Sequence, residues 1–160
     1  MMANILIVSI GTLKEEYLKD AVAEYKKRLG QYARVDEINL SEVQIKNEDS
    51  QAEIKRALDT EGERILSAIP KDHYKIAMCI EGVQYDSPEL ARRLETALDK
   101  SGKVALIIGS SHGLSDKVKA ACDMKLSVSK LTFPHQLMRA MLFEVLYRSF
   151  TIIAGKKYHK

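Results

Sequence analysis

The stretch Val104-Ala-Leu-Ile-Ile108 is the most hydrophobic of the strand-like segments in this 160-residue chain, and the turn Gly109-Ser-Ser-His-Gly113 follows it directly. A short, continuous apolar run bounded by a glycine-containing turn is typical of a strand buried on both faces of a parallel sheet. We therefore predict a central strand over residues 104–108. In open α/β sheets, ligands bind at the carboxyl ends of the strands, which makes the turn a first candidate site.

Strands and helices alternate on both sides of this run. Apolar runs predict further strands over residues 5–10, 34–40, 75–81 and 124–128, of which 34–40 is less buried. Apolar residues recur at helical spacing between them, and a long final helix is predicted over 135–153 after a loop at 129–134. This alternation predicts one α/β domain, residues 1–160, with a mainly parallel sheet and helices on both faces.

Local signals mark where the helices begin and end. A capping box pairs a Ser or Thr cap with a Glu three residues later, and proline is favoured at the first helical position. Gly30 and Pro70 are expected to end the first two helices. The start signals are, in chain order, the boxes Thr12–Glu15 and Ser50–Glu53, the cap Ser87 followed by Pro88, and the cap Ser115.

The composition is that of a soluble globular protein, with 46% hydrophobic residues, 29% charged residues and a net charge of +3. The only cysteines, Cys79 and Cys122, exclude a disulfide framework and a cysteine-based zinc site and indicate a reducing compartment. Residues 1–10 lack the features of a signal peptide and are too few to span a bilayer. We therefore expect a cytoplasmic protein with no membrane partner, and the mild positive charge is compatible with RNA.

The last predicted helix is more apolar than one sheet face requires. Residues 137–153 read LMRAMLFEVLYRSFTII, interrupted only by the charges of Arg139, Glu144 and Arg148. Such a helix needs two buried faces, because packing on one sheet covers a stripe of only about 100°. A central helix covered by its own chain would satisfy this, but we favour a homodimer with the helix in the interface.

Two segments could form a site, the 109–113 turn and the loop Ser127-Val-Ser-Lys-Leu-Thr-Phe-Pro134. The glycines let the backbone approach a flat ligand closely, and the loop can present backbone N–H and C=O groups to the edge of a base. An ordinary turn and an ordinary connection explain the same pattern equally well. The turn lacks the GK[ST] and GxGxxG signatures of nucleotide sites, and the chain has no HExxH, CxxC or GxSxG. We therefore predict neither a metal site nor a nucleophilic triad.

Several motifs are distributed over the whole chain. They are Glu61-Gly-Glu-Arg-Ile65, Ile108-Gly109 with Gly113-Leu-Ser115, Leu131-Thr-Phe-Pro-His-Gln-Leu-Met-Arg139, Glu144 with Tyr147-Arg148, and the terminal Tyr158-His-Lys160. Together they resemble the ribosomal RNA large subunit methyltransferase H family, essentially from end to end. The resemblance implies a SPOUT-type α/β fold with a C-terminal trefoil knot, active as a homodimer. It also implies transfer of a methyl group from S-adenosylmethionine to N3 of a pseudouridine (position 1915) in the 23S rRNA of the assembled ribosome.

By position in the family, the cofactor contacts carry over to residues on or just after three predicted strands. They are Met78, Gly109, Val128, Ser129, Lys130, Leu131, Thr132 and Phe133. The family commonly has a second glycine where this chain has Ser110, so Ser110 is left out of the expected site. For catalysis we expect Arg148, Tyr158 and His159 to remove the N3 proton or to stabilise the resulting anion. Arg139 is the less suitable cation, because at 3.6 residues per turn it lies about 180° around the helix from Arg148.

Other functions remain compatible with these residues. A knotted methyltransferase acting on another RNA uridine or on a tRNA ribose would have the same fold and cofactor. A non-catalytic ribosome-associated binding protein would keep the fold with a degenerate site. Glu144 is spaced to pair with Arg148 and has no other assigned role. The clusters at 26–28 and 156–160 are either solvated surface or contacts to RNA phosphates.

Overall fold

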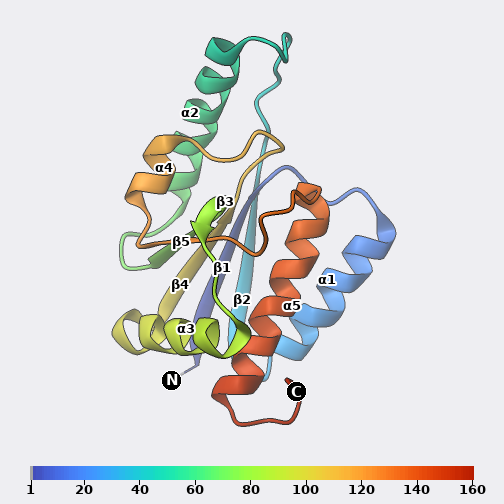
Figure 1. Ribbon diagram of the computed structural model, residues 1–160, viewed down its shortest axis with the longest axis vertical. Helices are drawn as coiled ribbons and strands as arrows, with labels where there is room; N and C mark the ends of the chain where they lie inside the picture. The colour runs from blue at the N-terminus through green and yellow to red at the C-terminus, as the bar shows by residue number, and fades with distance from the viewer. Residues whose placement is uncertain (1) are drawn as a thin grey trace.

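The computed structural model describes residues 2–160, which form a five-stranded sheet in the order β2-β1-β4-β3-β5 with every pair of neighbours parallel (Figure 1). The strands are β1 (Ala3–Ile10), β2 (Ala33–Leu40), β3 (Tyr74–Val83), β4 (Lys103–Ile108) and β5 (Met124–Leu126). Strand β4 is central, as the sequence predicts, because it pairs with β1 on one side and β3 on the other. Its residues 104–108 are at most 4% exposed.

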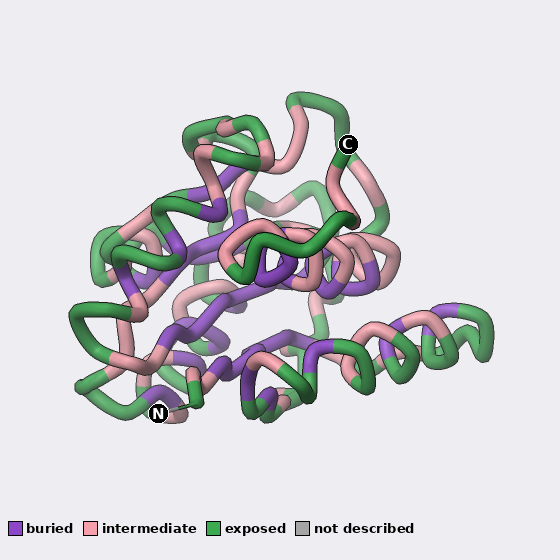
Figure 2. Tube along the Cα trace, turned by 90° about the horizontal axis from the view of Figure 1, so that it is seen from below, coloured by how far each residue is buried: buried purple, intermediate pink, exposed green. Residues whose placement is uncertain are grey.

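Helices cover both faces of the sheet because successive strand residues point to opposite sides. In β4, Val104, Leu106 and Ile108 belong to one core cluster, and Ala105 and Ile107 belong to the other. The first cluster lies under α1 (Glu16–Leu29), α3 (Ser87–Ser101) and α5 (His135–Ile153), and the second under α2 (Gln51–Ala68) and α4 (Asp116–Ala121). Figure 2 shows the buried strands running between the two helical layers. The predicted α/β class, the parallel sheet and the two covered faces are confirmed.

Two of the predicted helix starts are correct. The Ser50 hydroxyl accepts the Glu53 N–H at 3.2 Å at the start of α2. The Ser115 hydroxyl likewise accepts the Val118 N–H at 3.2 Å and caps α4. Each bond satisfies one of the backbone donors that a helix leaves free in its first turn.

The other two predicted starts are wrong. No side chain caps α1, which begins at Glu16 and not directly after Thr12. The Lys14 N–H, ahead of the helix, donates to the Gln136 side chain at 2.9 Å. Helix α3 is capped by Asp86, whose carboxylate accepts the Glu89 N–H at 2.8 Å, so Ser87 is already helical. In α3 the preceding residue therefore takes the capping role that the local pattern gave to Ser87.

Helix α5 packs between α1 and α3 and covers the middle of the sheet (Figure 1). One buried cation fixes its first turns: Arg139, 2% exposed, donates to the Asn39 side chain at 3.2 Å and to the Gly11 carbonyl at 3.1 Å. The side of α5 away from the sheet is half-buried and carries Met141, Val145, Arg148 and Ile152 at helical spacing. Within residues 2–160, no helix is long and apolar enough to cross a membrane.

Candidate active site

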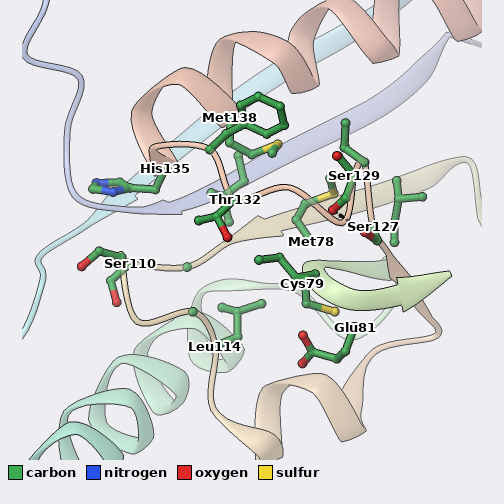
Figure 3. A pocket seen from close by; sticks show the side chains of 18 of the residues that line it. Met78, Cys79, Glu81, Ser110, Leu114, Ser127, Ser129, Thr132, His135 and Met138 are labelled. Atoms are coloured by element: carbon green, nitrogen blue, oxygen red, sulfur yellow. Dashed lines mark hydrogen bonds between the residues drawn. The ribbon is translucent and has the colours of Figure 1, made fainter. Parts of the chain in front are cut away.

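A cavity of about 710 Å³ lies at the carboxyl ends of β3, β4 and β5, where the sequence places both candidate segments (Figure 3). Its wall is formed by three stretches of chain and the start of α5. The lining residues are 78–81, 108–114, 126–129, 131–135, Lys119 and Met138. Most of the lining is apolar or backbone, which suits a flat organic ligand held by a few polar groups.

The 109–113 turn forms one wall and is tightly closed. A Cβ on Gly109 would lie 2.2 Å from the Gly113 carbonyl oxygen, so only glycine fits there. Gly113 adopts a φ of +89°, a conformation that L side chains rarely take, and its N–H bonds to the Ser110 carbonyl at 2.9 Å. The glycines of this turn therefore set its shape.

The loop after β5 forms the opposite wall and is fixed by its serines. The Ser127 N–H donates to the Val83 carbonyl at 3.0 Å, and the Ser127 hydroxyl donates to the Ser129 carbonyl at 3.0 Å. The Ser129 hydroxyl in turn accepts the Leu131 N–H at 3.0 Å. Leu131 itself is 70% exposed at the cavity mouth, which leaves an apolar side chain available to a ligand or a second molecule.

One ion pair borders the cavity on the side of β3. Lys119 contacts Glu81 at 2.5 Å, and this bond lowers the pKa of the Glu81 carboxyl and raises that of Lys119. Burial raises the pKa of the neighbouring Cys79 thiol, which favours its protonated form. Within the described part of the chain, no three His, Cys, Asp or Glu side chains are placed to hold a metal ion.

The structure brings together most of the residues expected to contact the cofactor. Those that line the cavity are Met78, Gly109, Val128, Ser129, Leu131, Thr132 and Phe133. Lys130 is exposed and lies outside the lining, because its side chain sits on the solvent side of the loop. Ser110, which the sequence reading left out, is buried and lines the cavity. The sequence pattern of the hydrophobic strand β4 followed by a glycine turn could have placed Ser110 among the expected site residues.

The residues expected to act in catalysis meet in a second cluster. This tail cluster consists of Glu144 and Arg148 on α5 with Tyr158 and His159 from the carboxyl-terminal segment. Glu144 accepts from Arg148 Nε at 2.8 Å, as their spacing predicts, and also from the Tyr158 hydroxyl at 2.9 Å. Arg148 Nη1 lies 3.2 Å from His159 Nδ1, and its guanidinium stands 4.7 Å from the centre of the Tyr158 ring. The sequence missed that Glu144 anchors the tail.

The tail cluster and the cavity are separated within one chain. No member of the tail cluster lines the cavity, which reaches α5 only as far as Met138. At 1.5 Å per residue, Arg148 lies about 15 Å further along the helix. Figure 1 shows the carboxyl terminus beside the far end of α5. Burial and the bond to Glu144 raise the pKa of Tyr158 to about 12, so its hydroxyl stays protonated at neutral pH.

The sequence matches a family model described as "Predicted SPOUT methyltransferase" over residues 3–159. A protein of Shouchella clausii named "Ribosomal RNA large subunit methyltransferase H" is 48% identical over 159 residues, which is 98% of this chain and 99% of that protein. The chain belongs to the ribosomal RNA large subunit methyltransferase H family of SPOUT methyltransferases. A family member of the same name from Bacillus pumilus is also 48% identical, over 158 residues covering 98% of this chain and 99% of that one.

A solved structure shares the architecture of this chain. A crystal structure described as a probable methyltransferase from Bordetella pertussis Tohama I superposes with a TM-score of 0.54. The alignment covers 93% of this chain and 95% of that one at 14% sequence identity, so it supports the architecture alone. The SPOUT-type sheet and helices expected from the resemblance are therefore confirmed.

Proposed function

We propose that this chain transfers the methyl group of S-adenosylmethionine to N3 of a pseudouridine, at position 1915, in the 23S rRNA of the large ribosomal subunit. The observation that carries the proposal is the cavity, because seven of the eight expected cofactor contacts surround it. The reaction would take place in the cytoplasm on assembled ribosomes, and the proposed fold includes the family's C-terminal trefoil knot.

The cavity fits the proposed cofactor. Its volume of about 710 Å³ lies within the range of about 300–1,000 Å³ found for small-molecule sites. The absence of a side chain at Gly109 lets the turn close against Gly113 and form a compact wall of backbone. Met78, Thr132 and Phe133 add apolar and polar side chains to the lining. S-adenosylmethionine supplies an electrophilic methyl group, so an in-line displacement needs mainly positioning of the acceptor.

The tail cluster supplies the groups that the acceptor requires. N3 of a uracil ring lies between two carbonyls and must lose its proton, and a nearby cation stabilises the anion that forms. We assign that cation to Arg148, which Glu144 holds in place. A guanidinium only donates, so His159 Nδ1 is the acceptor in their contact and the neutral imidazole carries its proton on Nε2. His159 can therefore accept the N3 proton at Nδ1 once the tail moves away from Arg148. Tyr158 contributes to the site through its hydrogen bond to Glu144 and its ring beside the Arg148 guanidinium.

A homodimer would bring the two parts of the site together. The half-buried outer side of α5, with Met141, Val145 and Ile152, offers an apolar surface to a second copy. Arg148 lies on this same side, so its cluster would face the partner. Since about 15 Å of helix separates Arg148 from the cavity of its own chain, we assign each cavity to the tail cluster of the partner subunit.

Binding to RNA would rest on charge and on a composite surface. The described residues 2–160 carry few exposed aromatic side chains, and the basic positions of α1 and the tail, such as Lys27, Lys156 and Lys157, are exposed. Lysine side chains of this kind contact phosphates and not bases, so binding should weaken as the salt concentration increases. We therefore expect the enzyme to need a folded ribosomal substrate, and efficient methylation of a short hairpin would contradict this.

The test uses labelled S-adenosylmethionine and ribosomes from two strains, one able and one unable to form the target pseudouridine. Label in large-subunit RNA from the first strain only is the expected result. Intact cofactor binding without label in either ribosome would assign the enzyme to another RNA. A protein that binds no S-adenosylmethionine would refute the proposed activity.

A further inference from the structure

The carboxyl-terminal tail turns back on α5 instead of continuing along its axis (Figure 1). The turn is a Schellman motif, in which the Gly155 N–H donates to the Ile152 carbonyl at 3.0 Å. The Lys156 N–H donates to the Thr151 carbonyl at 2.9 Å and completes the motif. Gly155 has a φ of +68°, which L side chains rarely adopt, and a Cβ there would meet no atom within 4 Å. The backbone conformation alone therefore requires glycine, and this conformation directs the tail back toward earlier turns of α5.

Tyr158 of the returning tail docks on an aromatic surface to which α1 and α5 both contribute. The Tyr158 ring meets the Tyr147 ring edge-on, with 4.8 Å between the ring centres. The centre of the Tyr147 ring also lies 6.1 Å from that of Tyr25 in α1 and 6.4 Å from that of Tyr32 in the turn after α1. Tilted and edge-on pairs about 4.5–7 Å apart are attractive, because ring edges carry positive and ring faces negative partial charge. Tyr25, Tyr32 and Tyr147 thus form a tyrosine platform for the tail.

The tyrosine platform is itself held in place by two further side chains. Tyr32 stacks on Phe150, with 6.0 Å between the ring centres and 6° between the ring planes, and Phe150 is a buried member of the first core cluster. The Arg28 guanidinium stands over the rings of Tyr25 and Tyr147, at 5.5 Å and 5.8 Å from their centres. A cation over the faces of two rings attracts both and keeps them together. The platform is therefore tied to the core and is formed before the tail docks.

The docked tyrosine determines where the next residue lies. The Tyr158 hydroxyl donates to Glu144 Oε2 at 2.9 Å, so both its ring and its hydroxyl are held. His159 follows directly, and its Nδ1 lies 3.2 Å from Arg148 Nη1. A chain terminus is poorly ordered unless contacts of this kind hold it. Because the anchor is one residue earlier, His159 can leave Arg148 while the tail stays docked.

We propose that Gly155 and the tyrosine platform are positioning elements for the tail: Gly155 directs the tail back along α5, and Tyr147 receives the Tyr158 ring, so that His159 is held at a fixed place. Helix α1, none of whose residues lines the cavity, thereby takes part in building the site. The use of His159 in methyl transfer rests on the function proposed above. The docking of the tail does not, because it is a property of the free protein.

Two variants remove the docking in different ways. Tyr147→Leu removes the ring that receives Tyr158 and keeps an apolar side chain, and Tyr147→Phe is its matched control because it keeps the ring. Gly155→Ala strains the turn without a steric clash. Its control is Gly102→Ala at the end of α3, where φ is +69° and the Cβ position is equally open. Hydrogen exchange of the Lys156 and Tyr158 amides, the Kd for S-adenosylmethionine and kcat with ribosomes would be measured for each variant.

In the free protein, exchange of the two tail amides should become about tenfold faster in Tyr147→Leu and in Gly155→Ala, the upper end of what one aromatic pair provides. Exchange should keep its wild-type rate in Tyr147→Phe and Gly102→Ala. In Tyr147→Leu and Gly155→Ala, kcat should fall on the order of tenfold as the docked fraction falls. The Kd should not change, because no residue of the tail lines the cavity.

Unchanged exchange of the tail amides in folded Tyr147→Leu and Gly155→Ala proteins would overturn the docking. Faster exchange without a fall in kcat, or a Kd that rises together with the exchange rate, would overturn the positioning role. If the wild type methylates no ribosome, the proposed function fails, and tail exchange in the free protein still decides whether the platform holds the tail.

Discussion

The 109–113 turn is closed so tightly at Gly109 that a single methyl group should open it. An alanine Cβ would lie 2.2 Å from the Gly113 carbonyl oxygen and 2.6 Å from its carbonyl carbon. Close C···O contacts in proteins are about 3.3–3.6 Å, so the turn must widen by about 1 Å. Overpacking a rigid site typically costs about 1–3 kcal/mol, and a clash with backbone belongs at the upper end of that range.

For Gly109→Ala we therefore expect a loss of about 3 kcal/mol in the free energy of unfolding, read from urea denaturation. Because the widened turn is also the cavity wall, the Kd for S-adenosylmethionine should rise about 100-fold in calorimetry. Gly102→Ala is the control: its Cβ would meet no atom within 4 Å, but its φ is +69°. It should cost about 1–2 kcal/mol of stability and leave the Kd unchanged. A Gly109→Ala protein with wild-type stability and affinity would refute this reasoning.

Three further substitutions test other contacts. Tyr158 has its pKa raised from 10.0 to about 12, so the unfolded chain loses the proton first and stability should fall between pH 10 and 12. In Tyr158→Phe the free energy of unfolding, measured by denaturation at a series of pH values, should not show this fall. The same dependence on pH in the variant and the wild type would contradict the raised pKa of Tyr158. Val145→Lys should turn a two-chain species into a single chain of 18.0 kDa in sedimentation, and a wild type that is already a single chain would contradict the dimer. Arg139→Lys keeps the buried charge but loses the pair of guanidinium hydrogen bonds to Asn39 and Gly11. The free energy of unfolding, measured by thermal denaturation, should fall by about 1–3 kcal/mol.

The order of strands and helices could be predicted from the sequence because it depends on periodicity, which is a local property. The run at 104–108 is buried on both faces, and α5 begins at His135 and ends at Ile153 as predicted. The start of α1 could not be predicted, because the segment before it is held by a contact outside the local pattern. The start of α3 was missed by one residue, because Asp86 and not Ser87 accepts the Glu89 N–H. The Lys14 N–H bonds to Gln136, which is 122 residues away in the sequence.

The candidate site also has features that could be predicted from the sequence and features that could not. The cavity could be located from sequence, because the carboxyl ends of neighbouring parallel strands meet at one edge of the sheet. The direction of each side chain on an irregular loop could not, and for this reason Lys130 was expected at the cavity and lies outside it. The burial of Glu61, which is 2% exposed, could not be predicted either, since a glutamate in an amphipathic helix is normally solvated.

The separation of the tail cluster from the cavity leads to a quantitative test. Helix α5 cannot slide to close the gap, because Leu142 and Phe143 are fully buried and Arg139 is tied to the ends of two strands. In the proposed function, Arg148 therefore acts on the cavity of a second chain.

Gly109→Ala disables the cavity and leaves the tail intact, whereas Arg148→Ala does the reverse. Each variant alone should be inactive in the ribosome methylation assay. After the two are unfolded and refolded together in equal amounts, half of the dimers pair one chain of each kind, and each of these holds one complete site out of two. Activity should therefore return to about one quarter of the wild-type value. The same quantities of each variant refolded separately and then mixed at once should show none. If every site were built within a single chain, co-refolding could restore nothing, so a mixture that stays inactive while forming dimers would refute the shared site.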